Sequence, residues 1–291
     1  MKKNLFLVMC MFALFFTTFA QDNALYMVKI PGMDIEMLEH EVTLALYESV
    51  MGEIPVLTER SVDVQTKEES VVKRYVQDEE DSFNRYPVIA VNAYDAIYFC
   101  NKLSELKGLE PVYSVDGKTD VKKWNYTPHE GRGINADIKQ DLSKNGYRLP
   151  TVDEWLYAAK GGEEKQYVES DDLNEVAWYQ KNAFLTRHPV KGKKANAFGL
   201  YDMFGNVWEW CYNDSIVKIE GKEVAQLAGR LLSGALGASS GVSSSADGIE
   251  FAECIGQSYR SSKIENIKSI NVQADNMPAD DIGFRVVRTV K

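Results

Sequence analysis

NAFGLYDMFGNVWEWCYND, residues 196–214, is the segment around which the rest of the chain is organised. It interleaves large aromatic rings with glycines and with Asn and Asp side chains. The rings can bury a large apolar area, while glycine, Asn and Asp permit tight turns with positive φ. We therefore expect a core strand in this stretch that is entered through a turn and carries polar groups at its edge.

Two other segments have the features of rigid core elements. In GYRLPTVDEWLYAAKGG, residues 146–162, Thr151 and Glu154 form a Thr-x-x-Glu capping box, which predicts a helix that ends at the double glycine. Arg148, just before this cap, is expected to pair with a buried carboxylate. Near the end of the chain, IGFRVVR at residues 282–288 alternates apolar positions as a final core strand does.

The first half of the chain contains two more helix signals. HEVT, residues 40–43, predicts a strand whose Thr43 caps a helix over residues 44–51, with Gly52 closing it. Asn92 with Asp95 three positions later predicts another capped helix start.

Two stretches of the first half are expected at the surface. His40 lies between two glutamates and has no second histidine nearby, so an exposed strand position is expected for it. Residues 56–84 are charged and poor in aromatic residues, which predicts an irregular surface loop.

Composition and charge exclude several classes of protein. The 291 residues are 45% hydrophobic, which suffices for one large core or at most two small domains. With 33 basic and 43 acidic residues, the chain has a net charge of −10, so the basic footprint of a nucleic-acid-binding protein is absent.

The N-terminus has the pattern of an export signal. Residues 1–20 combine two lysines, an apolar run and a small-residue exit, which predicts a signal peptide and a protein of the periplasm, the cell surface or the medium. No later stretch reaches the roughly 20 apolar residues of a membrane-spanning helix. Cys10 follows Leu-Val-Met and faintly resembles a lipoprotein box, but it lies so near the start that cleavage is favoured over a lipid anchor.

Three cysteines follow the predicted signal peptide. Cys100, Cys211 and Cys254 are widely spaced and odd in number, and they form no Cys-x-x-Cys or other metal-binding spacing. This argues against a disulfide framework, although a single bridge remains open. Cys100 and Cys211 are expected to be small buried hydrophobic residues.

The region between the aromatic stretch and IGFR has a different composition. Residues 233–281 are rich in small and polar groups and show no sustained helix or strand period. The sequence therefore predicts a polar loop region held between two rigid ends.

The ordered segments together resemble a known family. GYRLPTVDEWLYAAKGG, NAFGLYDMFGNVWEWCYND and IGFRVVR, in that order, are similar to the formylglycine-generating-enzyme (sulfatase-modifying-factor) type of C-type-lectin-like domain. HEVTLALYESVMG and YPVIAVNAYDAIYFCNKLS fit its earlier part. The resemblance implies a single α+β domain over residues 21–291, with little regular secondary structure and long ordered loops.

The catalytic chemistry of that family depends on a feature that this chain lacks. The oxidases of the family hold Cu(I) with two cysteines about five residues apart, and soft thiolates suit that ion. Here the comparable region contains Cys254 alone, with Ile249 five residues earlier, and the usual Gly-Gly-Ser-Trp is replaced by Ser-Gly-Ala-Leu at residues 233–236. A copper-dependent thiol oxidase, or another enzyme on the same scaffold, is therefore the alternative, and a non-catalytic member of the family is the preferred interpretation.

A second resemblance suggests what the polar loops do. Variable proteins of diversity-generating retroelements use this domain and place ligand-contacting residues between WEW-like and IGFR-like anchors. The same arrangement here implies a surface for a protein or glycan ligand, built like an antibody paratope. The candidate contacts are Ser243, Ser244, Asp247, Glu250, Tyr259, Arg260, Asn271, Gln273 and Asp275.

Several alternatives stay open for this loop region. Tyr259 and Arg260 are of the residue types that dominate binding energy, but Arg260 is alternatively a buried structural arginine. Alternatively, the whole region is a flexible Ser/Gly surface loop without a partner. A further alternative for the protein as a whole is an accessory or structural component of the envelope.

The family also binds calcium through loop oxygens. Asn206, Glu209 and Asp214 offer oxygen ligands of the right type for a structural calcium ion, as would any turn rich in Asn and Asp.

Overall fold

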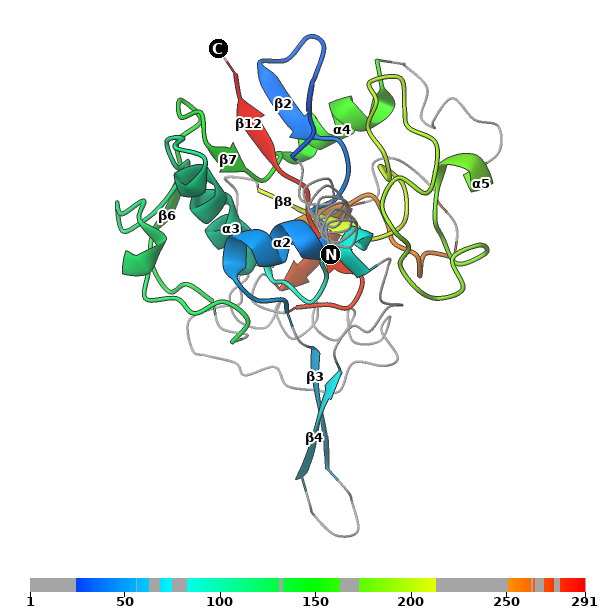
Figure 1. The fold of residues 1–291 in the computed structure, drawn as a ribbon, viewed down its shortest axis with the longest axis horizontal. Helices are drawn as coiled ribbons and strands as arrows, with labels where there is room; N and C mark the ends of the chain where they lie inside the picture. Colours follow the sequence, from blue (N-terminus) through cyan, green and yellow to red (C-terminus); the bar gives the residue numbers. More distant parts are fainter. Residues whose placement is uncertain are drawn as a thin grey trace, which may run out of the picture.

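The computed structural model describes residues 25–55, 57–62, 69–74, 83–130, 133–162, 173–212, 251–262, 264, 270–274 and 278–290. Short strands and helices alternate with long ordered loops in an α+β arrangement (Figure 1). Ser243, Ser244, Asp247, Glu250, Asp275 and Asp214 lie outside the described residues.

The first four-stranded sheet joins the two ends of the described chain to its middle. Its order is β1 (Met27–Lys29), β2 (Ile35–Leu38), β12 (Val287–Thr289) and β7 (Tyr147–Arg148), and all its pairs are antiparallel. Strand β12 therefore lies between the start of the domain and the segment that leads into helix α4 (Val152–Lys160).

The second four-stranded sheet contains the aromatic stretch. Its order is β10 (Ile270–Ala274), β9 (Phe251–Ile255), β8 (Trp208–Cys211) and β11 (Ile282–Gly283). Strand β11 runs parallel to β8, with Ile282 opposite Trp208. The core strand expected within residues 196–214 is thus confirmed, and β8 pairs on one side with β9 and on the other with β11, directly after the loop region.

IGFRVVR does not form the single strand that its alternation predicts. Residues 282–283 pair in the second sheet and residues 287–289 pair in the first, so the three residues between them cross from one sheet to the other. Alternation of apolar side chains cannot reveal this crossing because Phe284 and Val286 are buried in either arrangement.

The three longer helices begin where their capping signals predict. Helices α2 (Leu44–Met51), α3 (Ala93–Leu106) and α4 start after Thr43, Asn92 and Thr151, and the last two have complete capping boxes. Arg148 is buried and donates to both carboxylate oxygens of Glu154 at 2.6 Å, which confirms its predicted carboxylate partner. The remaining helical turns are α5 (Leu173–Val176), η1 (Phe83–Arg85) and η2 (Val121–Lys123).

The stretch predicted as an irregular loop, residues 56–84, contains a hairpin. Strands β3 (Leu57–Val62) and β4 (Glu69–Arg74) pair antiparallel and project from the body of the protein (Figure 1). A second small pair joins β5 (Tyr113–Val115) to β6 (Ile138–Gln140). The prediction of an irregular loop at residues 56–84 was wrong because a high content of charged residues indicates that a segment is solvated, but not whether its backbone pairs as strands.

Strand β8 separates two apolar clusters. Trp210 packs into the cluster that contains helices α2 and α3, while Cys211 packs with Trp155 of α4 in the other. Successive side chains of a strand point to opposite faces, so one short strand contributes to both. Cys100 and Cys211 are buried as predicted, and Cys254 is buried beside Trp210 in the first cluster.

Trp210→Ala is predicted to lower the free energy of unfolding by roughly 3–5 kcal/mol, the usual cost of deleting a fully buried aromatic side chain. Trp210 is 0% exposed and its indole N–H donates to the carbonyl oxygen of Val91 at 3.0 Å. Trp208 is only partly buried, so Trp208→Ala should cost less than half as much. Urea unfolding of both variants measures the difference, and equal losses would contradict the assignment of Trp210 to the core.

Candidate functional site

A buried ion pair lies where the two sheets meet. Arg285, between β11 and β12, donates from Nε to Oε2 of Glu209 and from Nη2 to Oε1, both at 2.6 Å. Both side chains are buried. Burial alone would lower the pKa of Arg285, but the charge and hydrogen bonds of Glu209 outweigh it and raise that pKa. The guanidinium is therefore a permanent cation inside the protein.

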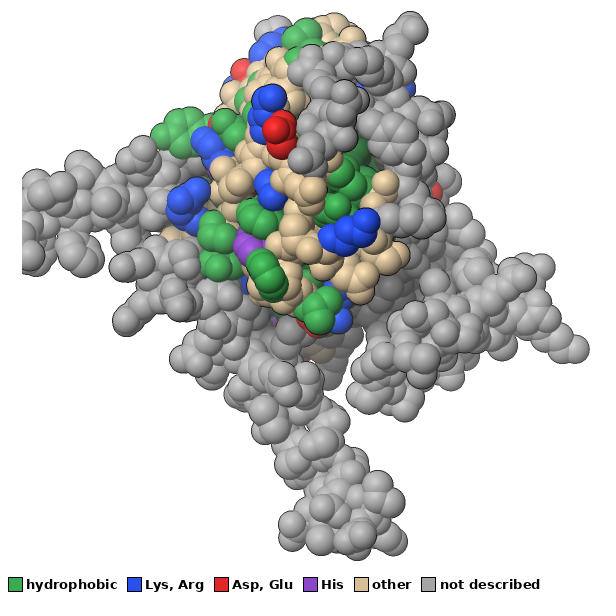
Figure 2. All heavy atoms as spheres, turned by 90° about the vertical axis from the view of Figure 1, so that its right-hand side faces the viewer, with side chains coloured by type: hydrophobic (Ala, Val, Ile, Leu, Met, Phe, Trp, Pro, Cys, Tyr) green, Lys and Arg blue, Asp and Glu red, His purple; other side chains and the backbone are tan. Residues whose placement is uncertain are grey.

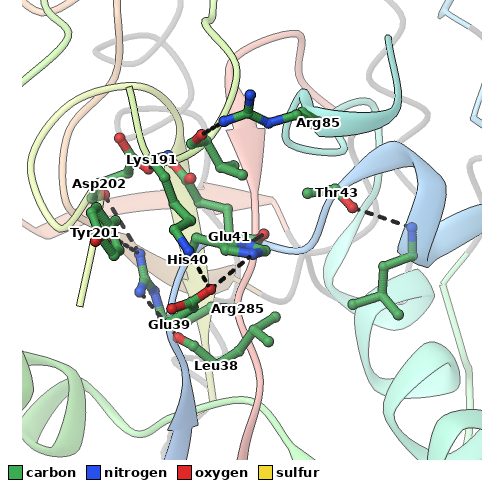
Figure 3. A network of polar contacts seen from close by, with 12 residues as sticks. Leu38, Glu39, His40, Glu41, Thr43, Arg85, Lys191, Tyr201, Asp202 and Arg285 are labelled. Atoms are coloured by element: carbon green, nitrogen blue, oxygen red, sulfur yellow. Dashed lines mark hydrogen bonds and ion pairs between the residues drawn. The ribbon is translucent and has the colours of Figure 1, made fainter. Parts of the chain in front are cut away.

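The same pair is tied to other segments. Nη2 of Arg285 donates to the carbonyl oxygen of Tyr201 at 3.1 Å, and Figure 3 shows the guanidinium between Leu38 and Asp202. Trp155 Nε1 donates to Glu209 Oε2 at 2.7 Å. Helix α4, strand β8 and residues 284–286, which cross between the two sheets, are thus held together by one set of charge-assisted hydrogen bonds.

Two further carboxyl groups are buried beside Arg285. Glu41 and Asp202 each have one carboxylate oxygen without a hydrogen-bond partner among the described residues. Burial raises the pKa of Glu41 well above its ordinary value, and the charges of Asp202 and Glu209 raise it further. Burial raises the pKa of Asp202 to about 6. These groups hold protons at pH values at which surface carboxyl groups are ionised.

His40 is buried at the rim of this network, which corrects the prediction of an exposed strand residue. Only 7% of it is exposed, and its Nδ1 lies 2.7 Å from the carbonyl oxygen of Glu41 (Figure 3). Burial lowers the pKa of His40 to about 4, so the ring is neutral at neutral pH and donates this hydrogen bond. Strand β2 ends at Leu38, and the bend that follows it turns the ring inward.

The described part of the predicted calcium site does not fit a calcium ion. Both oxygens of Glu209 accept hydrogen bonds from Arg285, and Oδ1 of Asn206 accepts one from the backbone N–H of His188 at 2.9 Å. Among the described residues no group of three or more His, Cys, Asp and Glu could hold a metal ion. Asn206 and Glu209 instead stabilise the framework.

The turn before β8 positions two loops. Gly205 has φ +74, and a Cβ there would lie 1.9 Å from the carbonyl oxygen of Trp178, so only glycine fits. The N–H of Gly205 donates to the carbonyl oxygen of Gly256, and the N–H of Tyr259 donates to that of Asn206. The Gly-Asn pair therefore fixes the loop after β9 against the loop that contains Trp178.

That fixed loop carries the described candidate contacts. Arg260 is exposed, its Nε donates to Tyr259 Oη at 3.1 Å, and its Nη2 pairs with Asp280. Tyr259 is only 5% exposed, and its hydroxyl donates to the carbonyl oxygen of Asp280 at 3.2 Å. Tyr259 is therefore the support on which Arg260 rests, which corrects its prediction as a rim contact.

The structure also adds residues that the sequence did not single out. Ser258 Oγ donates to Asp281 at 2.7 Å, and the Trp208 N–H donates to the carbonyl oxygen of Asp281. Burial raises the pKa of Asp281. Asp280 and Asp281 are adjacent and come directly before IGFR, and this pair of acids is the sequence feature that could have identified them as site residues. The alternative that Arg260 is a buried structural arginine is wrong, because Arg260 is exposed. The buried arginine of this region is Arg285, which the sequence did not single out.

Two other candidates lie on an edge strand. Asn271 and Gln273 belong to β10, where they are opposite Cys254 and Ala252 of β9. Strand β10 is the last strand of its sheet on that side. The structure therefore brings Tyr259 and Arg260 together with Asp280 and Asp281, while Asn271 and Gln273 mark the edge of the sheet.

Asp202→Asn is predicted to change how stability depends on pH. The pKa of Asp202 is about 6 in the folded protein against an ordinary 3.8, so its stabilising proton uptake is complete below about pH 4 and is lost as pH rises through about 6. Relative to the parent, the variant should gain on the order of 3 kcal/mol between pH 4 and pH 7. The lowered pKa of His40 makes its contribution to stability fall as pH falls, but His40 is present in both parent and variant, so this contribution cancels in the comparison.

Urea unfolding of parent and variant between pH 4 and pH 7 measures this difference. Parallel curves across that range would contradict the buried position of the Asp202 carboxyl group.

Comparisons with known proteins agree with this architecture. A family model described as the sulfatase-modifying factor enzyme 1-like domain matches residues 15–290. "Chaperone protein LppX" of Paenibacillus barcinonensis is 40% identical over 155 residues, which are 43% of this chain and 51% of that protein. The formylglycine-generating enzyme of Mycobacterium tuberculosis is 38% identical over 79 residues, 22% of this chain and 26% of the enzyme.

A solved structure covers more of the chain. Treponema denticola variable protein 1 is 26% identical, with a TM-score of 0.63 and coverage of 92% of each chain. By contrast, the matched segments span about half the length of LppX and about a quarter of the mycobacterial enzyme. With the family model matching nearly the whole sequence and this fold observed, the chain belongs to the sulfatase-modifying factor enzyme 1-like (formylglycine-generating-enzyme type) domain family.

Proposed function

We propose that this protein is an exported, non-catalytic binding protein that presents its C-terminal loop surface to a protein or glycan ligand. The observation that carries the proposal is the arrangement of Arg260, an exposed cation held by Tyr259 and Asp280 on a loop that is fixed to the core. A charged group held in place loses little conformational entropy on binding, which is the usual property of an energetic anchor.

The position of Cys254 supports a non-catalytic role. Its thiol is 0% exposed and lies on β9, opposite Trp210 of β8. Copper-dependent oxidation of a substrate cysteine needs two accessible thiolates, and the other two cysteines after residue 20 are buried as well. The residues present do not fit the Cu(I) site of the family's oxidases.

The comparisons support a binding role and favour a polypeptide as the ligand. Treponema denticola variable protein 1 shares the fold over almost the whole chain, and the LppX relative is described as a chaperone, a class of protein that binds other proteins. By analogy, the ligand here would be a protein at the cell envelope. Residues 1–20 would direct export, and no helix among the described residues is long and apolar enough to cross a membrane.

Arg260→Ala is predicted to weaken ligand binding at least tenfold while leaving the thermal midpoint within about 2 °C of the parent. The guanidinium is exposed and its pair with Asp280 is about half exposed, so its loss costs the fold little. The ligand would be isolated from envelope and surface fractions on immobilised parent protein, and its affinity then measured by calorimetry.

Lys139→Ala, which removes an exposed ion pair with Asp137 on another part of the fold, is the matched control. Equal affinity of the parent, Arg260→Ala and Lys139→Ala would contradict the proposed site. Whether the loop is diversified is a separate question, which the neighbouring DNA answers. A near-copy of codons 230–288 differing mainly at adenines, beside a reverse transcriptase, is the expected signature of a variable protein.

A further inference from the structure

An apolar tip protrudes from the long loop between α5 and β8. Phe184 is 86% exposed and Leu185 is 66% exposed, the two highest values among the large hydrophobic residues that the structure describes. Both residues have positive φ, 52° and 58°, a conformation that suits glycine and strains bulky side chains. Two large apolar side chains thus occupy positions where the backbone conformation is unfavourable for them and where they gain no burial in the core.

The 184–185 tip is held rigidly from both sides. Ala183 is buried, its N–H donates to the carbonyl oxygen of Tyr179 at 2.8 Å, and its carbonyl oxygen accepts from the Thr186 N–H at 3.1 Å. On the other side Arg187 is 4% exposed, with its guanidinium over the Tyr86 ring. The tip is therefore a preorganised protrusion and not a loose loop.

The surroundings of the tip are basic although the protein is acidic. Residues 176–201 contain four lysines and one arginine but no Asp or Glu, against a net charge of −10 for the whole chain. Lys181 and Lys194 are exposed, although Lys194 lies 3.9 Å from a carboxylate oxygen of Glu175 and Lys191 pairs with Glu39 at 2.8 Å. Figure 2 shows this side of the molecule, where hydrophobic and basic side chains outnumber acidic ones on the coloured surface.

Aromatic rings connect the tip to the basic residues. The carbonyl oxygen of Ala183 lies 3.0 Å from His188 Nε2, the His188 ring stacks on Trp178 at 3.9 Å, and Lys193 Nζ lies 3.7 Å from the centre of the Trp178 ring. Partly buried Trp rings such as that of Trp178 are enriched at the headgroup level of membranes, because one part of the ring is apolar and the other polar.

We propose that the 184–185 tip inserts into the surface of an anionic lipid bilayer, with the surrounding lysines against the headgroups. This surface is separate from Arg260, and the proposal does not depend on the proposed ligand. Charge complementarity selects a negatively charged partner, since each lysine near an anionic bilayer strengthens binding about fivefold. A bilayer accepts two protruding apolar side chains without a matching pocket, whereas a protein partner requires one.

A fluorescent probe at the tip tests the proposal. The chain with Cys10→Ser and Leu185→Cys would be labelled with an environment-sensitive fluorophore, because Cys100, Cys211 and Cys254 are buried. Vesicles of phosphatidylglycerol and phosphatidylcholine should shift the emission to shorter wavelength, and vesicles of phosphatidylcholine alone should not. Lys181→Ala should raise the lipid concentration at half-maximal response about fivefold.

Leu106→Cys, labelled in the same way, is the matched control because Leu106 is 60% exposed at the end of α3. The apolar residues near the N-terminus are shared by both chains, so tethering through them cannot produce a response at position 185 alone. Phe184→Gly, which suits the positive φ, should weaken the response about tenfold without lowering the thermal midpoint.

Three results would overturn the proposal. In the first, the probe at position 185 gives no shift with anionic vesicles. In the second, probes at 185 and 106 give equal shifts. In the third, soluble polyglutamate produces the shift and the vesicles do not, which would assign the tip to an acidic protein partner.

Discussion

The ion pair between Arg285 and Glu209 is the interaction on which the rest of the structure depends. Removing two charges from water costs several kcal/mol for each ion, and the pair offsets this cost only through good geometry and additional hydrogen bonds. Both conditions hold here, with two 2.6 Å contacts between the charges and further bonds to Trp155 and Tyr201. The segments around the pair cannot shift separately without leaving a buried charge unpaired.

This constraint explains how the fold presents its C-terminal loops. Strand β8 and strand β11 lie side by side, with Glu209 on β8 and Arg285 two residues after the end of β11. The Gly205–Asn206 turn then fixes the loop that carries Tyr259 and Arg260. The exposed Arg260 on this loop therefore differs in role from the buried pair that holds the scaffold, and a binding protein on a fixed scaffold requires such a division.

Local features were predictable from the sequence because their partners are three to six residues apart. The caps at Thr43, Asn92 and Thr151 are of this kind, and so is the pairing of Arg148 with a nearby carboxylate. The α+β fold followed from the resemblance of the ordered segments to a known family. The aromatic composition of residues 196–214 also indicated the core strand, since few other arrangements bury so many rings.

Two of the errors concern contacts between distant segments. His40 is buried where the charges of Lys191 and Arg285 act on it, and the hydroxyl of Tyr259 donates to the carbonyl oxygen of Asp280, which is 21 residues away. No period or composition encodes such contacts. The sequence therefore predicted the region of the candidate site. The structure was needed to show that Tyr259 is a buried support and Arg260 an exposed contact.

The most direct test of this account is the free energy of unfolding of Glu209→Gln, measured with urea together with hydrogen exchange at the Trp208 amide. If the pair anchors both ends of the loop region, the variant should lose roughly 3–5 kcal/mol because it leaves Arg285 buried and unpaired. The Trp208 amide, which bonds to the carbonyl oxygen of Asp281, should exchange faster. A loss below about 1 kcal/mol with unchanged exchange would contradict the account.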